Sequence, residues 1–161
     1  MRLLVRKISK SKWTSGDTVP EDIQADAITG CLRTHGNKLS VWAIQDESSI
    51  DEAFLALVAA GDRLDTIDVV QMNFEELQKD GFRCARTKGR TPVEDLVDTH
   101  LDICDLSYGK LGVIACYIAN MVRNGKQVRR TVGELKEILR TAIAEGRLSE
   151  EELKEDIRKK L

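Results

Sequence analysis

Helix start signals are the most legible feature of this sequence, and they restrict the folds that the chain can adopt. Each signal places a capping side chain three residues before a carboxylate, as in "SIDE" (49–52), "NFEE" (73–76), "TPVE" (91–94), "TVGE" (131–134) and "SEEE" (149–152). The capping oxygen accepts a hydrogen bond from an amide at the helix start, and the carboxylate favours the positive helix end. Together with glycines that can end a helix, these signals predict helices near 50–60, 74–80, 92–104, 108–124, 132–145 and 150–160.

Segments with strand character lie mainly in the first half of the chain. Alternation and β-branched residues predict strands over 2–8, 27–34, 38–45, 66–72 and 82–87. The short connection "HGN" predicts a hairpin between 27–34 and 38–45, and residues 9–26 are expected to form a surface loop. Strands followed by helices indicate an α+β fold, in which a mixed, mostly antiparallel sheet packs against C-terminal helices.

The chain is long enough for one domain with its own hydrophobic core. We expect an α+β core domain over 1–130 and a helical hairpin over 131–161, packed on that core as one globular unit. The segment "KLGVIACYIANMV" (110–122) is apolar almost all round, which predicts a central core helix.

Composition argues against several classes of protein. The chain is 42% hydrophobic and 32% charged with a net charge of −2, which does not favour disorder, broad nucleic-acid binding or attachment to an anionic membrane. The N-terminal apolar run is too short for a secretory signal or a membrane span, so we expect a cytoplasmic protein. Thiols stay reduced in that compartment, and the four cysteines are therefore predicted to be free.

Motifs assign no chemistry to this chain. It contains no P-loop, no GxGxxG after a strand, no HExxH, no GxSxG and no EF-hand loop. We therefore predict no cofactor, name no catalytic residue and leave open whether the protein is an enzyme.

Two histidine–cysteine pairs share one spacing. On the predicted helix from Thr91, His100 and Cys104 face the apolar stripe, which favours a hydrogen-bonded core histidine beside an inert thiol. Cys31 and His35 are also four residues apart, and the two pairs together would supply the four ligands of a zinc site. The predicted strand holds Cys31 away from His35, so no metal is expected. A cysteine–histidine nucleophilic pair is a further alternative.

A basic loop is the candidate ligand site. It leads from a predicted strand to the helix start at Thr91, and its cationic residues are Arg83, Arg86, Lys88 and Arg90. Positive charge and free amides at a helix start can bind an anion such as a phosphate or a nucleotide, and Arg33 could contribute from the hairpin. Glu94 and Asp95 in the first helical turn would repel an anion, which favours a solvated loop instead.

A second basic cluster lies between two predicted helices and consists of Arg123, Lys126, Arg129 and Arg130. If both clusters shared a face, they would form a modest nucleic-acid patch. Basic residues also suit the C-terminal end of the preceding helix, so we do not expect nucleic acid to be the main partner.

Apolar residues outside the predicted core suggest an interaction surface. Trp42 and Ile44 lie on the strand face opposite Val41, where they are exposed unless both faces of the sheet are covered. Leu153 and Ile157 form a narrow stripe on the last predicted helix, which packs within the chain or binds a groove. An apolar core helix in a small domain also favours a homodimer.

These features together predict a cytoplasmic protein-interaction or regulatory binding module. Its expected partner is another protein or a second copy of the chain, without membrane contact. The first alternative is an enzyme or sensor that binds a phosphate or nucleotide ligand at the basic loop (83–90). The second alternative is a weak nucleic-acid binder.

Overall fold

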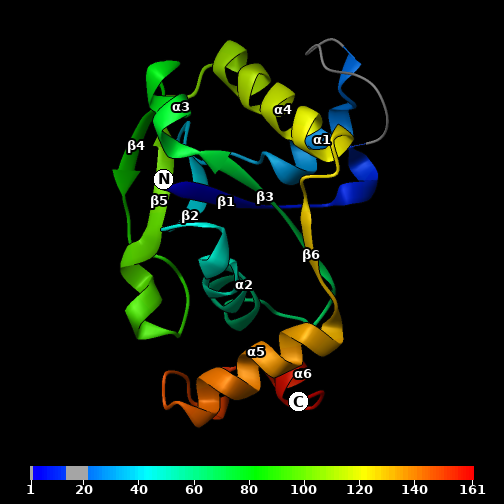
Figure 1. The fold of residues 1–161 in the computed structure, drawn as a ribbon, viewed down its shortest axis with the longest axis vertical. Coiled ribbons are helices and arrows are strands. Elements are labelled where there is room, and N and C mark those ends of the chain that lie inside the picture. The colour runs from blue at the N-terminus through cyan, green and yellow to red at the C-terminus, as the bar shows by residue number, and fades with distance from the viewer. Residues whose placement is uncertain (1, 14–21) are drawn as a thin grey trace.

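The computed structural model describes residues 2–13 and 22–161, and its centre is a six-stranded antiparallel sheet with helices on both faces (Figure 1). The order of the strands across the sheet is β4-β5-β2-β1-β3-β6. Their bounds are β1 (Leu3–Ile8), β2 (Leu39–Ile44), β3 (Ile67–Asn73), β4 (Arg83–Arg86), β5 (His100–Cys104) and β6 (Val128–Arg130). The predicted α+β class is confirmed, and every strand pair is antiparallel.

Two helical layers enclose the sheet. One layer contains α2 (Ile50–Ala59), α5 (Val132–Ala144) and α6 (Glu155–Arg158), and the other contains α1 (Ala25–Cys31), α3 (Phe74–Lys79) and α4 (Tyr108–Arg123). In the described residues, short 3-10 turns lie at η1 (Lys10–Lys12), η3 (Glu47–Ser49), η4 (Glu94–Thr99) and η5 (Glu150–Glu152). Part of the predicted surface loop over 9–26 lies outside the described residues.

Strand alternation explains the two cores. On the central strand β1, Leu3 and Val5 face the layer with α2, while Leu4 and Ile8 face the layer with α4. Successive side chains of a strand point to opposite faces, so a strand covered on both sides must be apolar on both.

The most buried helix is α2, and the prediction of a central core helix over 110–122 is wrong. Seven of the ten α2 residues are buried, whereas α4 buries only Ile114, Ala115 and Ile118. Tyr108 at the start of α4 is 94% exposed. One stripe of α4 covers the sheet, most of its other apolar residues are partly buried against the same layer, and Val113 is exposed.

The predicted strand over 27–34 is instead the helix α1, so the predicted hairpin is also wrong. Ala27 and Cys31 are both buried, as residues four apart on one helical face should be. The "HGN" turn does form, with a bridge between His35 and Lys38, but β2 pairs with β1 and β5 instead of an upstream arm.

The predicted helix over 92–104 is replaced by η4 and β5. Strand β5 pairs with β2 on one side and with β4 on the other, so its backbone hydrogen bonds come from the sheet. Leu101 and Ile103 face the layer with α4, which matches strand alternation. Tertiary pairing here outweighs the local helix signal that begins at Thr91.

The C-terminal part packs on the same core as α2. Leu135, Leu139 and Ile157 are fully buried within the cluster that contains Phe54 of α2. The predicted last helix is much shorter than expected, because residue 153 is extended between η5 and α6. A domain boundary at residue 131 stays a prediction.

Candidate functional site

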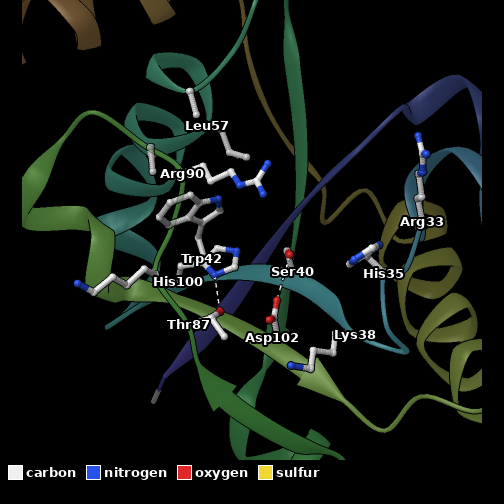
Figure 2. Close-up of a pocket in the computed structure, with 13 residues that line it drawn as sticks. Arg33, His35, Lys38, Ser40, Trp42, Leu57, Thr87, Arg90, His100 and Asp102 are labelled. Carbon is white, nitrogen blue, oxygen red and sulfur yellow. Dashed lines mark hydrogen bonds between the residues drawn. The ribbon is translucent and has the colours of Figure 1, made fainter. Parts of the chain in front are cut away.

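A cavity of about 720 Å³ opens beside α2, above the sheet where β2 and β5 run together (Figure 2). Its lining comes from four parts of the chain: the connection between α1 and β2, strand β2 itself, helix α2, and the stretch from the loop after β4 to β5. Figure 2 shows Arg33 and His35 at one end and Trp42 and Arg90 at the other. Ser40 and Asp102 lie between the two ends.

The floor of the cavity consists of two cross-strand pairs. Ser40 lies opposite Asp102, and Trp42 lies opposite His100, in the register of β2 and β5. Directly opposed residues point to the same face of a sheet, so all four side chains meet on the side that faces α2. The Ser40 hydroxyl donates to Oδ1 of Asp102 at 3.0 Å, and the rings of Trp42 and His100 meet edge to face with centroids 5.1 Å apart.

The loop after β4 closes one end of the cavity. The amide of Thr87 donates to the His100 carbonyl oxygen at 3.2 Å, and the amide of Gly89 donates to the Val97 carbonyl oxygen at 2.9 Å. Gly89 packs directly against the Trp42 ring: a Cβ at this position would be 2.7 Å from Cζ3 of Trp42 and closer still to Cη2. This contact holds the neighbouring Lys88 and Arg90 at the rim of the cavity.

Arg6, a residue of the sheet, positions the other end of the cavity, where Arg33 and His35 lie. Arg6 of β1 donates from Nε and Nη2 to the Cys31 carbonyl oxygen at 2.9 and 2.7 Å, and from Nη1 to the Ser40 carbonyl oxygen at 2.8 Å. Positive charge at a helix C-terminus is favourable, so Arg6 fastens the end of α1 to β2. The turn that follows α1 thereby carries Arg33, His35 and Lys38 to the cavity.

The charge of the cavity is strongly unbalanced. Four cationic side chains line it (Arg33, Lys38, Lys88 and Arg90), together with a single carboxylate, Asp102. Within the described part of the chain, none of the four is within ion-pair distance of a carboxylate. Five other arginines do pair with carboxylates: Arg83, Arg129, Arg130, Arg140 and Arg147. Among residues 2–13 and 22–161, the cavity therefore gathers four cations that form no direct ion pair with a carboxylate.

Within the floor, His100 is half-buried and lies next to the loop after β4. Its Nδ1 is 2.7 Å from Oγ1 of Thr87. Burial lowers the pKa of His100, and the nearby Asp102 carboxylate opposes part of that effect. The imidazole is therefore neutral at pH 7 and can both donate and accept a hydrogen bond.

The structure brings only some of the residues predicted for an anion site to the cavity, and anion binding by them stays a prediction. Lys88 and Arg90 line the cavity, and so does Arg33. Arg83 instead pairs with Asp105 at 2.8 Å. Arg86 lies opposite Leu101 and so belongs to the other face of the sheet, because strand β4 alternates in the same way as β5. The helix expected to start at Thr91 is absent. A 3-10 turn, η4, begins three residues later at Glu94.

The sheet separates one of the candidates for zinc, Cys31, from the two histidines. His35 and His100 both line the cavity, whereas Cys31 is buried in the core layer that contains α4, and the Cys104 thiol donates to the Asp102 carbonyl oxygen. Among residues 2–13 and 22–161, no three His, Cys, Asp or Glu side chains are arranged for a metal ion.

The four residues predicted as an interaction surface are buried within the chain. Trp42, Ile44, Leu153 and Ile157 are at most 8% exposed and belong to the core cluster around α2. Trp42 and Ile44 are buried because helices cover both faces of the sheet, and Leu153 and Ile157 are buried because the C-terminal segment packs on the same cluster as α2.

The second basic cluster is separate from the cavity. Arg129 pairs with Asp68, and Arg130 pairs with Asp51. Both arginines belong to β6, at the opposite edge of the sheet from β4. The two clusters therefore do not form the shared nucleic-acid patch that their sequence positions allowed.

Sequence reasoning missed Lys38, Thr87 and Asp102 as cavity residues. The alternation in "KLSVW" (38–42) places Lys38 on the same face as Ser40 and Trp42, and it is a usable signal for Lys38. The pattern in "HLDIC" (100–104) also fits the helix predicted over 92–104, and a helix would not place Asp102 beside Ser40.

No family model matches the chain, and searches of the curated proteins and of the solved structures also return no match. In the part of the chain that the structure describes, no helix is long and apolar enough to cross a membrane.

Proposed function

We propose that the protein binds a small phosphate-bearing ligand in the cavity between α2 and the β2–β5 floor. The observation that carries this proposal is the convergence of Arg33, Lys38, Lys88 and Arg90 on one cavity without carboxylate partners among the described residues. Unpaired cations around a concave site raise the local concentration of anions and form charge-assisted hydrogen bonds with them.

The residue types match phosphate chemistry. Arginine offers a planar fork of donors that matches two phosphate oxygens, and lysine adds a mobile point charge. Both kinds occur at each end of the cavity, as Arg33 with Lys38 and as Arg90 with Lys88. The volume of about 720 Å³ lies within the range of small-molecule sites and exceeds what a single inorganic anion needs.

Protein interaction ranks below anion binding as a function for this chain. The apolar residues that suggested a protein partner are buried in the core, so they are not available on the surface to contact another protein. The cationic cavity is in contrast accessible, since all four of its cations are exposed.

Thermal unfolding with and without sodium pyrophosphate at constant ionic strength tests the proposal. A ligand present at 100 times its dissociation constant stabilises the native state by about 2.7 kcal/mol, which raises the Tm of a chain of this size by about 5 °C or more. Arg33→Ala and Arg90→Ala should each reduce the shift, because each removes a phosphate donor.

Arg86→Ala is the matched control. Arg86 belongs to the same basic segment as Arg90 but lies on the opposite face of the sheet, so its removal should leave the pyrophosphate shift unchanged. Equal loss of the shift in the Arg86 and Arg90 variants would point to nonspecific attraction. The absence of any shift in the wild-type protein with phosphate, pyrophosphate and tripolyphosphate would overturn the proposal.

A further inference from the structure

The cavity contains more than an anion site needs. Opposite the floor, α2 and the residue that follows it present an apolar wall of Ala56, Leu57 and Ala60. In Figure 2, Leu57 lies close to Arg90 and to the buried Trp42. A bare phosphate gains nothing from such a wall, whereas a ligand with a flat apolar portion gains by removing it from water.

Asp102 is the second feature that a simple anion site does not explain. Its carboxylate lies on the floor between the two cationic ends, and it would repel a phosphate placed directly above it. Oδ1 accepts one hydrogen bond from Ser40. A carboxylate oxygen has further acceptor capacity, which suits a ligand that presents hydroxyl groups at this point. Recognition of ribose hydroxyls by a carboxylate beside a phosphate site is chemically common.

The position of His100 agrees with the same ligand. The half-buried, neutral imidazole lies next to Asp102 on β5 and beside Trp42, so the floor offers uncharged as well as anionic hydrogen-bonding groups. The cavity thus has three chemically different surfaces. The floor offers hydrogen-bonding groups, the α2 wall offers apolar carbons, and the rim carries the cationic side chains of Arg33, Lys38, Lys88 and Arg90.

From this division we infer that the phosphate ligand is a ribonucleoside phosphate. This inference rests on the proposed function and specifies the ligand class of the same cavity. The base packs against the α2 wall at Leu57, the ribose hydroxyls donate to Asp102, and the phosphate binds the cationic rim. A free nucleotide and the phosphorylated end of an RNA chain share this chemistry.

Isothermal titration calorimetry with a stepwise ligand series tests the inference. The series is inorganic phosphate, ribose 5-phosphate, the four ribonucleoside 5′-monophosphates and their 2′-deoxy counterparts, all at one ionic strength. At least one ribonucleotide should bind about tenfold more tightly than ribose 5-phosphate, because only the nucleotide reaches the wall. Loss of the 2′-hydroxyl should weaken binding by about tenfold, as expected for a hydrogen bond to a charged group.

Two variants assign the parts of the ligand to residues. Asp102→Asn keeps an acceptor for Ser40 but removes the charge, so it should reduce the preference for ribose over deoxyribose without weakening inorganic phosphate. Leu57→Asn should lower the affinity for the nucleotide towards that of ribose 5-phosphate. Arg86→Ala should leave all affinities unchanged.

The outcomes separate this inference from the function on which it rests. Equal affinity for phosphate, ribose 5-phosphate and every nucleotide, with loss of all binding in Arg90→Ala, would overturn the nucleotide inference and leave anion binding intact. No binding of any member of the series would overturn both. A 5′-phosphorylated tetraribonucleotide that binds more tightly than the free nucleotide would support the ribonucleotide chemistry and identify the end of an RNA chain as its source.

Discussion

At the scale of single residues, Gly89 determines where the basic loop lies. The loop crosses the Trp42 ring at a distance that leaves no space for a side chain, and its amide is held by the Val97 carbonyl oxygen. Because the ring is itself 8% exposed and packed against the core, it has little freedom to move away. The absence of a side chain at position 89 therefore brings Lys88 and Arg90 to the cavity.

Gly89→Ala should destabilise the protein by about 1–3 kcal/mol, the usual cost of forcing an extra carbon into a packed site. The same change should weaken pyrophosphate binding, since the loop must lift away from Trp42. Urea unfolding measures the stability. Gly109→Ala is the matched control: the nearest atom is 3.9 Å away, and the helical position favours alanine. A Gly89 variant as stable as the Gly109 variant would contradict the packing argument.

His100 should make stability depend on pH in a defined direction. Because burial lowers its pKa in the folded state, the unfolded chain binds the proton more readily. Stability is therefore complete above the ordinary histidine pKa of about 6.5 and falls as the pH decreases towards the folded value. His100→Gln should flatten this decline in urea titrations between about pH 5 and pH 8.

The second histidine provides the control for this experiment. His35 is exposed at the other end of the cavity, so His35→Gln should retain the decline of stability on acidification. A wild-type profile that does not weaken towards low pH, or one that is the same in His100→Gln, would be inconsistent with the buried position of His100.

At the scale of elements, the local signals worked where the chain itself supplies the hydrogen bonds. Asn73 caps α3, and Thr131 with Glu134 forms the predicted capping box of α5. The signals failed where the sheet supplies the bonds. The helix-like pattern after Thr91 gives way to β5, which has a partner strand on both sides. The β-branched stretch after Ala27 fails in the opposite sense, because it forms the helix α1 and buries Ala27 and Cys31 on one helical face. Such competition depends on distant residues that a local pattern does not contain.

The cap of α5 gives a prediction at this scale. Thr131→Ala removes the oxygen that accepts from the Glu134 amide, and it should cost about 1 kcal/mol of stability. Thr131→Ser keeps the hydroxyl and should stay close to the wild type. Urea unfolding of the two variants measures their free energies of unfolding. Equal values for the alanine and serine proteins would show that the Thr131 cap does not contribute to stability.

At the scale of the whole molecule, the candidate site is a product of topology. Arg33, Trp42, Leu57 and Arg90 come from four separate segments and meet only because β5 enters the sheet between β4 and β2. The sequence indicated a basic loop and named Arg33 as a contributor, but it could not show that Arg83 and Arg86 point elsewhere. Strand order decides which members of a basic cluster share a face, and no local spacing encodes strand order.

The same topology makes the C-terminal segment part of the core that supports the cavity. Leu139 of α5 is fully buried in the cluster that contains Phe54 and Ala56 of α2, and α2 forms the apolar wall of the site. Leu139→Ala should therefore lower the free energy of unfolding by about 2–5 kcal/mol. Val113→Ala, at an exposed position of α4, should change it by no more than about 0.5 kcal/mol.

The unfolding profile of the Leu139 variant distinguishes one cooperative unit from two. In a Trp13→Phe background, where Trp42 is the only tryptophan, helix loss followed by circular dichroism and the change in fluorescence should coincide, because Trp42 and Leu139 belong to one hydrophobic cluster. If Leu139→Ala instead loses helix in a separate earlier transition while the fluorescence of Trp42 persists, residues 131–161 unfold alone. In that case the cavity wall on α2 would be stable without them, and binding of pyrophosphate would survive the first transition.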